Sequence, residues 1–180
     1  MRLLLLSLGL LAGCTSLVPS TVAQLDGFSP VTADPADIAL ALQLPEGVGL
    51  TPAGATLFLG AERDDTGEET GLTIRLAQRS DAELGEVFEI APDDRAAFRA
   101  EQARIAAWQA EAPEAVQGTL SLGVAPCRFG AGPARSARAS ADIRFAQGAP
   151  FRPLLREAPL SRIADQGDVS EWPDCVTDAT

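Results

Sequence analysis

Large apolar side chains alternate with smaller or polar residues over residues 37–44, at Ile38, Leu40, Leu42 and Leu44. This two-residue period places the four side chains on one face of an extended strand. Similar short runs occur at residues 56–60, 72–76, 87–90, 120–124 and 143–145. The Pro-Glu-Gly sequence at residues 45–47 is typical of a turn. A chain with this many strand-forming runs is expected to build a sheet.

The period changes to that of a helix between Asp93 and Pro113. Asp93 suits an N-cap, the residues between are mostly good helix formers, and the proline ends the segment. Apolar side chains fall near one face, at Phe98, Ile105, Trp108 and Ala112. We expect them to pack the helix on the sheet, with ligand stacking by Trp108 as the alternative. The pattern predicts an α+β domain, a mainly antiparallel β-sheet with one amphipathic helix packed on it.

Residues 56–60 and 72–76 flank the run ERDDTGEETG, which predicts a hairpin with a long polar loop. Its carboxylates could bind Ca²⁺, but the spacing of an EF-hand is absent, and a solvated acidic tip is the simpler interpretation. Gly130 and Gly132 lack the third glycine of a phosphate loop, so a turn is expected there. We therefore predict no metal and no cofactor. The segment from residue 151 onward predicts no clear element.

The N-terminal segment is an apolar run that stops at a cysteine. Arg2 provides a positive start, residues 3–11 are mostly leucine, and two small residues precede Cys14. As a helix, residues 1–13 would span about 20 Å, less than the roughly 30 Å of a hydrocarbon core. The stretch Leu11-Ala12-Gly13-Cys14 resembles the lipobox of bacterial lipoproteins. This resemblance implies that Cys14 carries a diacylglyceryl group and becomes the N-terminus after cleavage; an ordinary signal peptide is the alternative.

The resemblance also implies a location. Thr15 and Ser16 follow Cys14 without the aspartate of a retention signal, which in Gram-negative lipoproteins favours the outer membrane over the inner membrane. Two or three acyl chains, at about 0.8 kcal/mol per buried methylene, anchor a protein durably without a spanning helix. We expect a cell-envelope protein that faces the periplasm and contacts the membrane through this anchor.

Cys127 and Cys175 are the cysteines that remain once Cys14 is lipidated. Because an exported protein lies in an oxidising compartment, the two are predicted to form a disulfide. A redox pair is the alternative, although such pairs usually have closely spaced cysteines. The bond would tie an acidic C-terminal tail to the rest of the domain.

The composition excludes several common kinds of site. Histidine and lysine are absent, so all 14 basic residues are arginine. Without them the chain cannot form a Ser-His-Asp relay, an imidazole metal ligand, a Schiff base or a Walker-type phosphate grip. The net charge of −11 also disfavours nucleic acid as a partner, because phosphate contacts require a basic face.

Arginines are concentrated between residues 128 and 162, a segment that contains seven arginines and only two acidic residues. Such a segment could bind an anion or an acidic partner protein, and the residues that we would test are Arg128, Arg135, Arg138 and Arg144. Pairing of these arginines with the chain's own carboxylates is the simpler interpretation.

These patterns predict a lipoprotein signal peptide over residues 1–13, a lipidated tether over 14–35 and a single α+β domain over 36–180. We expect the domain to act as a binding or assembly module with an envelope protein as a partner, because no catalytic constellation is recognisable. The alternatives are an envelope enzyme that uses carboxylate and arginine chemistry, for example in glycan hydrolysis, and a purely structural lipoprotein.

Replacement of the lipidated residue tests the anchor. In Cys14→Ser the thiol that accepts the lipid is lost, so the protein should no longer incorporate a labelled fatty acid in the producing bacterium. The matched variant Ser16→Ala should keep the label. Equal labelling of both variants would show that Cys14 is not the attachment point.

Overall fold

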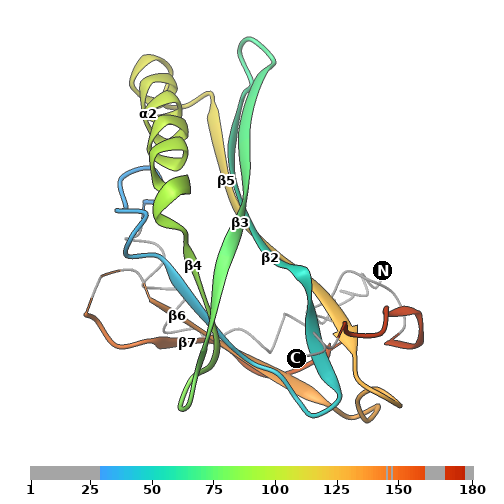
Figure 1. Cartoon of the computed structure of the whole chain (residues 1–180). Coiled ribbons are helices and arrows are strands. Elements are labelled where there is room, and N and C mark those ends of the chain that lie inside the picture. The colour runs from blue at the N-terminus through green and yellow to red at the C-terminus, as the bar shows by residue number, and fades with distance from the viewer. Residues whose placement is uncertain (1–28, 145, 147, 161–168, 177–180) are drawn as a thin grey trace, which may run out of the picture.

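Seven antiparallel strands form a sheet with the order β5-β2-β3-β4-β1-β6-β7. The computed structural model describes residues 29–144, 146, 148–160 and 169–176 (Figure 1). The strands are β1 (Ala39–Gln43), β2 (Val48–Arg63), β3 (Glu68–Asp81), β4 (Gly85–Ile90), β5 (Val116–Arg128), β6 (Arg138–Arg144) and β7 (Arg152–Pro159). This part of the chain also contains the helix α2 (Arg95–Glu111) and two 3-10 helices, η1 (Pro92–Asp94) and η3 (Val169–Glu171). The predicted α+β class is confirmed, with a mainly antiparallel sheet and one α-helix in the described residues.

The sheet changes direction where β2 passes from its first half to its second. Leu50 of β2 lies opposite Pro126 of β5, but Ala55 lies opposite Val124, so extra residues are inserted on β2 only. Such a bulge bends the strand and increases its twist. Beyond it, β2, β3 and β5 continue as a three-stranded extension, which we call the arm (residues 55–63, 68–76 and 116–124; Figure 1).

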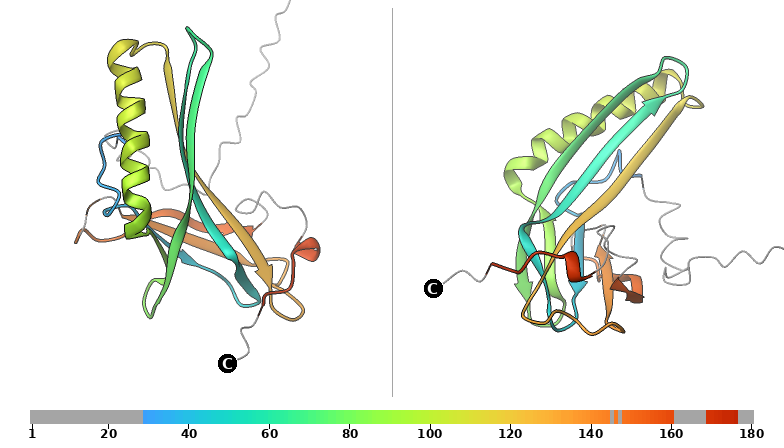
Figure 2. Two further views of the ribbon diagram at one scale, coloured as in Figure 1. Left: turned by 45° about the horizontal axis from the view of Figure 1, so that its top comes forward. Right: turned by 90° about the vertical axis from the view of Figure 1, so that its right-hand side faces the viewer.

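Helix α2 runs along the arm (Figure 2). Phe98 and Ile105 are fully buried and join a core with Leu57, Leu59 and Ile74 of the arm. These arm residues share one face because they alternate along β2 and pair across to β3. The helix therefore covers part of the apolar face of the arm, as the sequence predicted for Phe98 and Ile105.

Two polar side chains of α2 are also buried. The hydroxyl of Thr70 donates a hydrogen bond of 2.6 Å to Oε1 of Glu101. Nε2 of Gln102 donates to the carbonyl oxygens of Pro30 and Ala33, at 2.6 and 2.8 Å. Residues 29–35, which the sequence assigns to the tether, are thus fixed to the helix. The tether is shorter than expected at this end, and residues 14–28 lie outside the described part of the chain.

Three details differ from the sequence-based expectations. Asp93 is not the N-cap, because Pro92 already begins a helical turn as part of η1, and Asp94 takes the N-cap position of α2. The hairpin loop is short, because the β2–β3 pairing continues outward to Arg63 and Glu68. The segment after residue 151 forms β7, an edge strand where proline is tolerated. The turn predicted at Gly130 is confirmed, and Phe145 lies outside the described residues.

Cys127 and Cys175 form the predicted disulfide. Beside it, the N–H of Cys175 donates a hydrogen bond of 2.9 Å to the carbonyl oxygen of Arg128 at the end of β5. The C-terminal segment therefore extends the free edge of β5 over a short distance. Trp172 is buried in a small second core with Val48, Ala139 and Leu160. The disulfide and this core together fix the C-terminal segment to the sheet.

Removal of the disulfide should loosen the C-terminal segment. The cysteines are separated by 48 residues, and in the chain-entropy model a loop of that size is worth about 4 kcal/mol. We expect Cys127→Ser/Cys175→Ser to lower the free energy of unfolding by up to about this amount in urea titrations. Limited proteolysis should then cut first near Trp172. An unchanged free energy of unfolding would contradict a structural role for the bond.

Candidate functional site

The sheet curls around an apolar cavity of about 410 Å³. Both edge strands, β5 and β7, contribute to its wall, although five strands separate them in the sheet. All seven strands and the segment before β1 supply the lining, which consists of Pro30, Ile38, Ala39, Leu40, Leu57, Leu76, Phe88, Leu120, Ser121, Leu122, Ile143 and Leu154. A cavity of this volume lies within the range of small-molecule binding sites, about 300–1,000 Å³.

Strand register explains why these side chains meet. Leu40 of β1 lies opposite Phe88 of β4 on one side and opposite Ile143 of β6 on the other. Leu57 of β2 lies opposite Leu122 of β5. Residues directly opposite in an antiparallel pair point to the same face, so the alternating apolar positions all face the inside of the curl.

A bulge in β7 adds one more apolar side chain to the wall. Leu155 lies opposite Ala141, whereas Pro153 lies opposite the next residue of β6, so Leu154 is an extra residue on β7. Leu154 lines the large cavity and Leu155 lines a neighbouring space of about 30 Å³. Because of the bulge, two consecutive leucines both line interior spaces. In a regular strand, consecutive side chains would point to opposite faces.

The cavity is deep on one side and open on the other. Phe88 and Leu57 are only 1% and 5% exposed. Leu122 on the edge strand β5 is 40% exposed and marks the mouth. In the part of the chain that the structure describes, β5 and β7 are the two edges of the sheet and do not pair with each other. The inner wall is thus a buried part of the core, and the opening lies along the edge of the sheet.

The chemistry of the wall is uniform. Among the described residues that line the cavity, only Ser121 has a hydrogen-bonding side chain, and none is charged. Such a wall offers dispersion contacts and removal of apolar surface from water, but no ligand for a metal and no acid or base. In the ranges that the structure describes, no cluster of three or more acidic or cysteine side chains could hold a metal ion.

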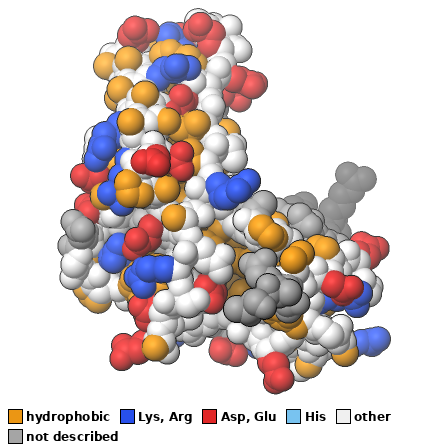
Figure 3. Space-filling view, viewed as in Figure 1, with side chains coloured by type: hydrophobic (Ala, Val, Ile, Leu, Met, Phe, Trp, Pro, Cys, Tyr) orange, Lys and Arg blue, Asp and Glu red, His pale blue; other side chains and the backbone are white. Residues whose placement is uncertain are grey.

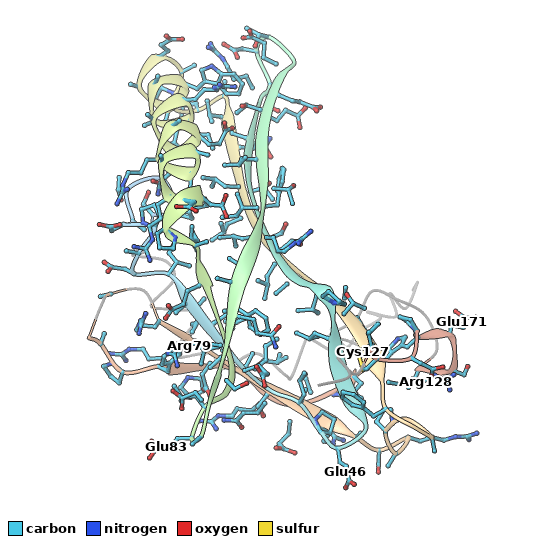
Figure 4. All side chains as sticks on the ribbon, in the orientation of Figure 1. Glu46, Arg79, Glu83, Cys127, Arg128 and Glu171 are labelled. Carbon is cyan, nitrogen blue, oxygen red and sulfur yellow. A yellow bond between two sulfur atoms is a disulfide. The ribbon has the colours of Figure 1, made fainter. Side chains whose placement is uncertain are left out.

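The four arginines singled out by the sequence lie apart from this cavity, and they do not form one patch. Arg128 donates from Nε to the carbonyl oxygen of Trp172 at 3.1 Å and forms an ion pair of 3.1 Å with Asp174. Arg144 forms an ion pair of 3.1 Å with Glu89. Glu89 also forms an ion pair with Arg79, so Arg79 lies close to Arg144. Figure 4 shows Arg79 and Arg128 on opposite sides of the molecule.

The other two arginines have different surroundings. Arg138 donates a hydrogen bond of 2.6 Å to the carbonyl oxygen of Glu157. Arg135 is exposed and shares with Arg128 a surface hollow of about 660 Å³ lined largely by alanine and proline. The structure thus brings together two of the four arginines. Anion binding by this pair stays a prediction.

The acidic tip of the β2–β3 hairpin is internally paired. Arg63 contacts Asp65 at 2.9 Å and Glu111 of α2 at 2.9 Å, and its guanidinium lies 6.0 Å from the ring centre of Trp108. The hydrogen bond from Arg63 lowers the pKa of Asp65 below its usual value, and it raises the pKa of Arg63. Gln117 donates to Asp64 at 2.7 Å. These contacts show Trp108 and two of the loop carboxylates in structural roles.

The molecular surface carries acidic and basic side chains side by side, with acidic side chains at the tip of the arm (Figure 3). The face in view has no extended area of one charge. Among the described residues, no helix is both long and apolar enough to cross a membrane.

Sequence reasoning placed many of the lining residues on strands but did not find the cavity. Leu40, Leu122 and Ile143 were recognised as alternating apolar residues. The chain has more alternating apolar residues than the one predicted helix can cover, and this excess is the signal that could have indicated a cavity. Comparison of the chain with known protein families, with curated proteins and with solved structures found no match in any of the three.

The ion pair at the arm tip should make stability depend on pH. Because the folded pKa of Asp65 lies below its unfolded value, the pair contributes stability above about pH 4, and this contribution is lost as pH falls through the folded pKa. Asp65→Asn should therefore be less stable than the parent chain at pH 7, and the difference should shrink at pH 3. Urea unfolding at both pH values measures this, and a difference that does not change with pH would contradict it.

Proposed function

We propose that this chain is a lipid-anchored cell-envelope lipoprotein whose domain is a binding module for an apolar small molecule. The cavity is the observation that carries the proposal. It combines a volume of about 410 Å³ with a described lining in which Ser121 is the only residue with a polar side chain and none is charged. Apolar spaces of only about 150 Å³ already bind benzene-sized molecules in other proteins, so this one has room for a larger ligand.

The structure of the wall supports binding over mere imperfect packing. Well-packed interiors leave few voids larger than a water molecule. Here the inner residues are nearly fully buried, and the mouth residue Leu122 remains accessible. A preformed apolar site with one open side can take up a ligand without rearrangement of its core.

The lipid anchor, inferred from the resemblance of residues 11–14 to a lipobox, would hold this site close to a membrane. The alternative of glycan hydrolysis has less support at this site. It requires a pair of carboxylates at the bound sugar, and none of the described residues that line the cavity is acidic. A structural lipoprotein would not need a cavity at all.

An apolar fluorophore tests the proposal. N-phenyl-1-naphthylamine, which brightens in apolar surroundings, should bind the soluble chain that starts at residue 15. Leu154→Asp should weaken binding by about tenfold or more, because the carboxylate must either lose its hydration or draw water into the cavity. Bound fluorophore should also raise the melting temperature of the parent chain.

Two comparisons make this test specific. Val176→Asp places the same charge at a residue that is 72% exposed and outside the cavity, so it should bind like the parent chain. Leu122→Asp alters the accessible mouth with little risk to folding and should also weaken binding. Absence of brightening, or equal binding by all three variants, would overturn the proposal.

A further inference from the structure

We propose that the ligand is an unbranched acyl chain of a membrane lipid. The chain enters the cavity at its open side, between the two edge strands β5 and β7, while the head group of the lipid stays outside. This inference rests on the proposed function and specifies its ligand. Three features carry it, namely the chemistry of the wall, the position of the mouth and the point at which the tether reaches the domain.

The wall selects a hydrocarbon. Ligands with ring nitrogens, carbonyl groups or several hydroxyls bind where a few polar groups fix their orientation. Among the lining residues that the structure describes, only Ser121 has a side chain that can form a hydrogen bond, and it lies between Leu120 and Leu122 on the edge strand. A polar ligand group buried here would therefore lose its hydrogen bonds to water and gain none from the wall. A methylene chain has no such hydrogen bonds to lose.

The mouth suits a ligand with one polar end. It lies along the edge of the sheet, where Leu122 is 40% exposed and, in the described residues, the edge strands β5 and β7 do not pair with each other. The opposite wall, with Phe88 at its base, is buried. A chain can therefore enter from this edge and leave its charged head group in water.

The tether brings this mouth to the membrane. Pro30 lines the cavity, and its carbonyl oxygen is held by Gln102 of α2 at 2.6 Å. Only residues 15–29 separate it from Cys14, the expected lipid attachment point. Fully extended, such a segment reaches at most about 55 Å, and as a flexible chain it spans about 22 Å on average. A domain anchored at Cys14 is thus tied to the lipid surface by the segment that borders its own cavity.

A chain-length series tests the ligand class. Saturated fatty acids of eight to eighteen carbons should displace the fluorophore from the soluble chain that starts at residue 15. Each added methylene that enters the cavity should tighten binding about fourfold, until the cavity is filled and the affinity levels off. Leu154→Trp occupies part of the space and should move the plateau to shorter acids. Leu122→Trp at the accessible mouth is the second such variant, and Val176→Trp is the control.

The outcomes separate this inference from the proposed function. If the fluorophore binds and the tryptophan variants expel it, but fatty acids do not compete, the binding module stands and the acyl-chain ligand is wrong. If acids compete without a plateau, or the plateau is the same in all variants, the hydrocarbon binds outside the cavity and the inference is also wrong. If neither ligand binds, both fail.

The source of the acyl chain requires a second experiment. The lipidated full-length product is placed in vesicles whose phosphatidylethanolamine carries a photoreactive group on one acyl chain. Crosslinks to peptides of β1, β4 and β7 are the expected result. The opposite result is that the chain without its lipid anchor crosslinks at these peptides and the lipidated protein does not. The protein's own anchor would then fill the cavity, and a membrane lipid as the source would be wrong.

Discussion

The bend of β2 is the constraint on which the rest of the structure depends. The extra residues between Leu50 and Ala55 bend β2, so the arm, whose apolar face α2 covers in part, leaves the rest of the sheet in a different direction (Figure 1). The helix contacts β2, β3 and β5 of the arm. Leu122 of the arm and Leu154 of β7 line one space, and no residue of α2 is among its described lining residues. The cavity therefore lies between the arm and the other strands of the sheet.

The sequence predicted the elements more completely than their assembly. Alternation located most of the strands, and the change of period located the helix, because both depend on local spacing. The disulfide followed from the number of cysteines and the expected compartment. The cavity could not be found this way, since it depends on register irregularities in β2 and β7 that the alternation within one strand does not reveal. The edge strand β7 was hidden by its prolines, and the buried Gln102 gave no sign that it holds residues 29–35.

The paired arginines and the apolar cavity lie in different parts of this molecule. The arginines that are close in sequence, such as Arg128 and Arg144, are distributed over different partners, among them Asp174 and Glu89. In a strand-rich fold, sequence proximity says little about surface proximity, because side chains alternate between faces and strands run in opposite directions. The apolar cavity, in contrast, has no charged side chain among its described lining residues. The site with the clearest physical character is therefore the apolar one.

Methyl NMR tests the central claim, that the interior of the curl is a ligand site, most directly. The chain would be labelled with ¹³C at leucine, isoleucine and valine methyl groups and mixed with a saturated fatty acid. The account predicts intermolecular nuclear Overhauser effects from the acyl protons to Leu57, Leu76 and Leu154, with Val176 unaffected. Contacts limited to exposed methyl groups such as that of Val176, or no contacts at saturating ligand, would contradict it.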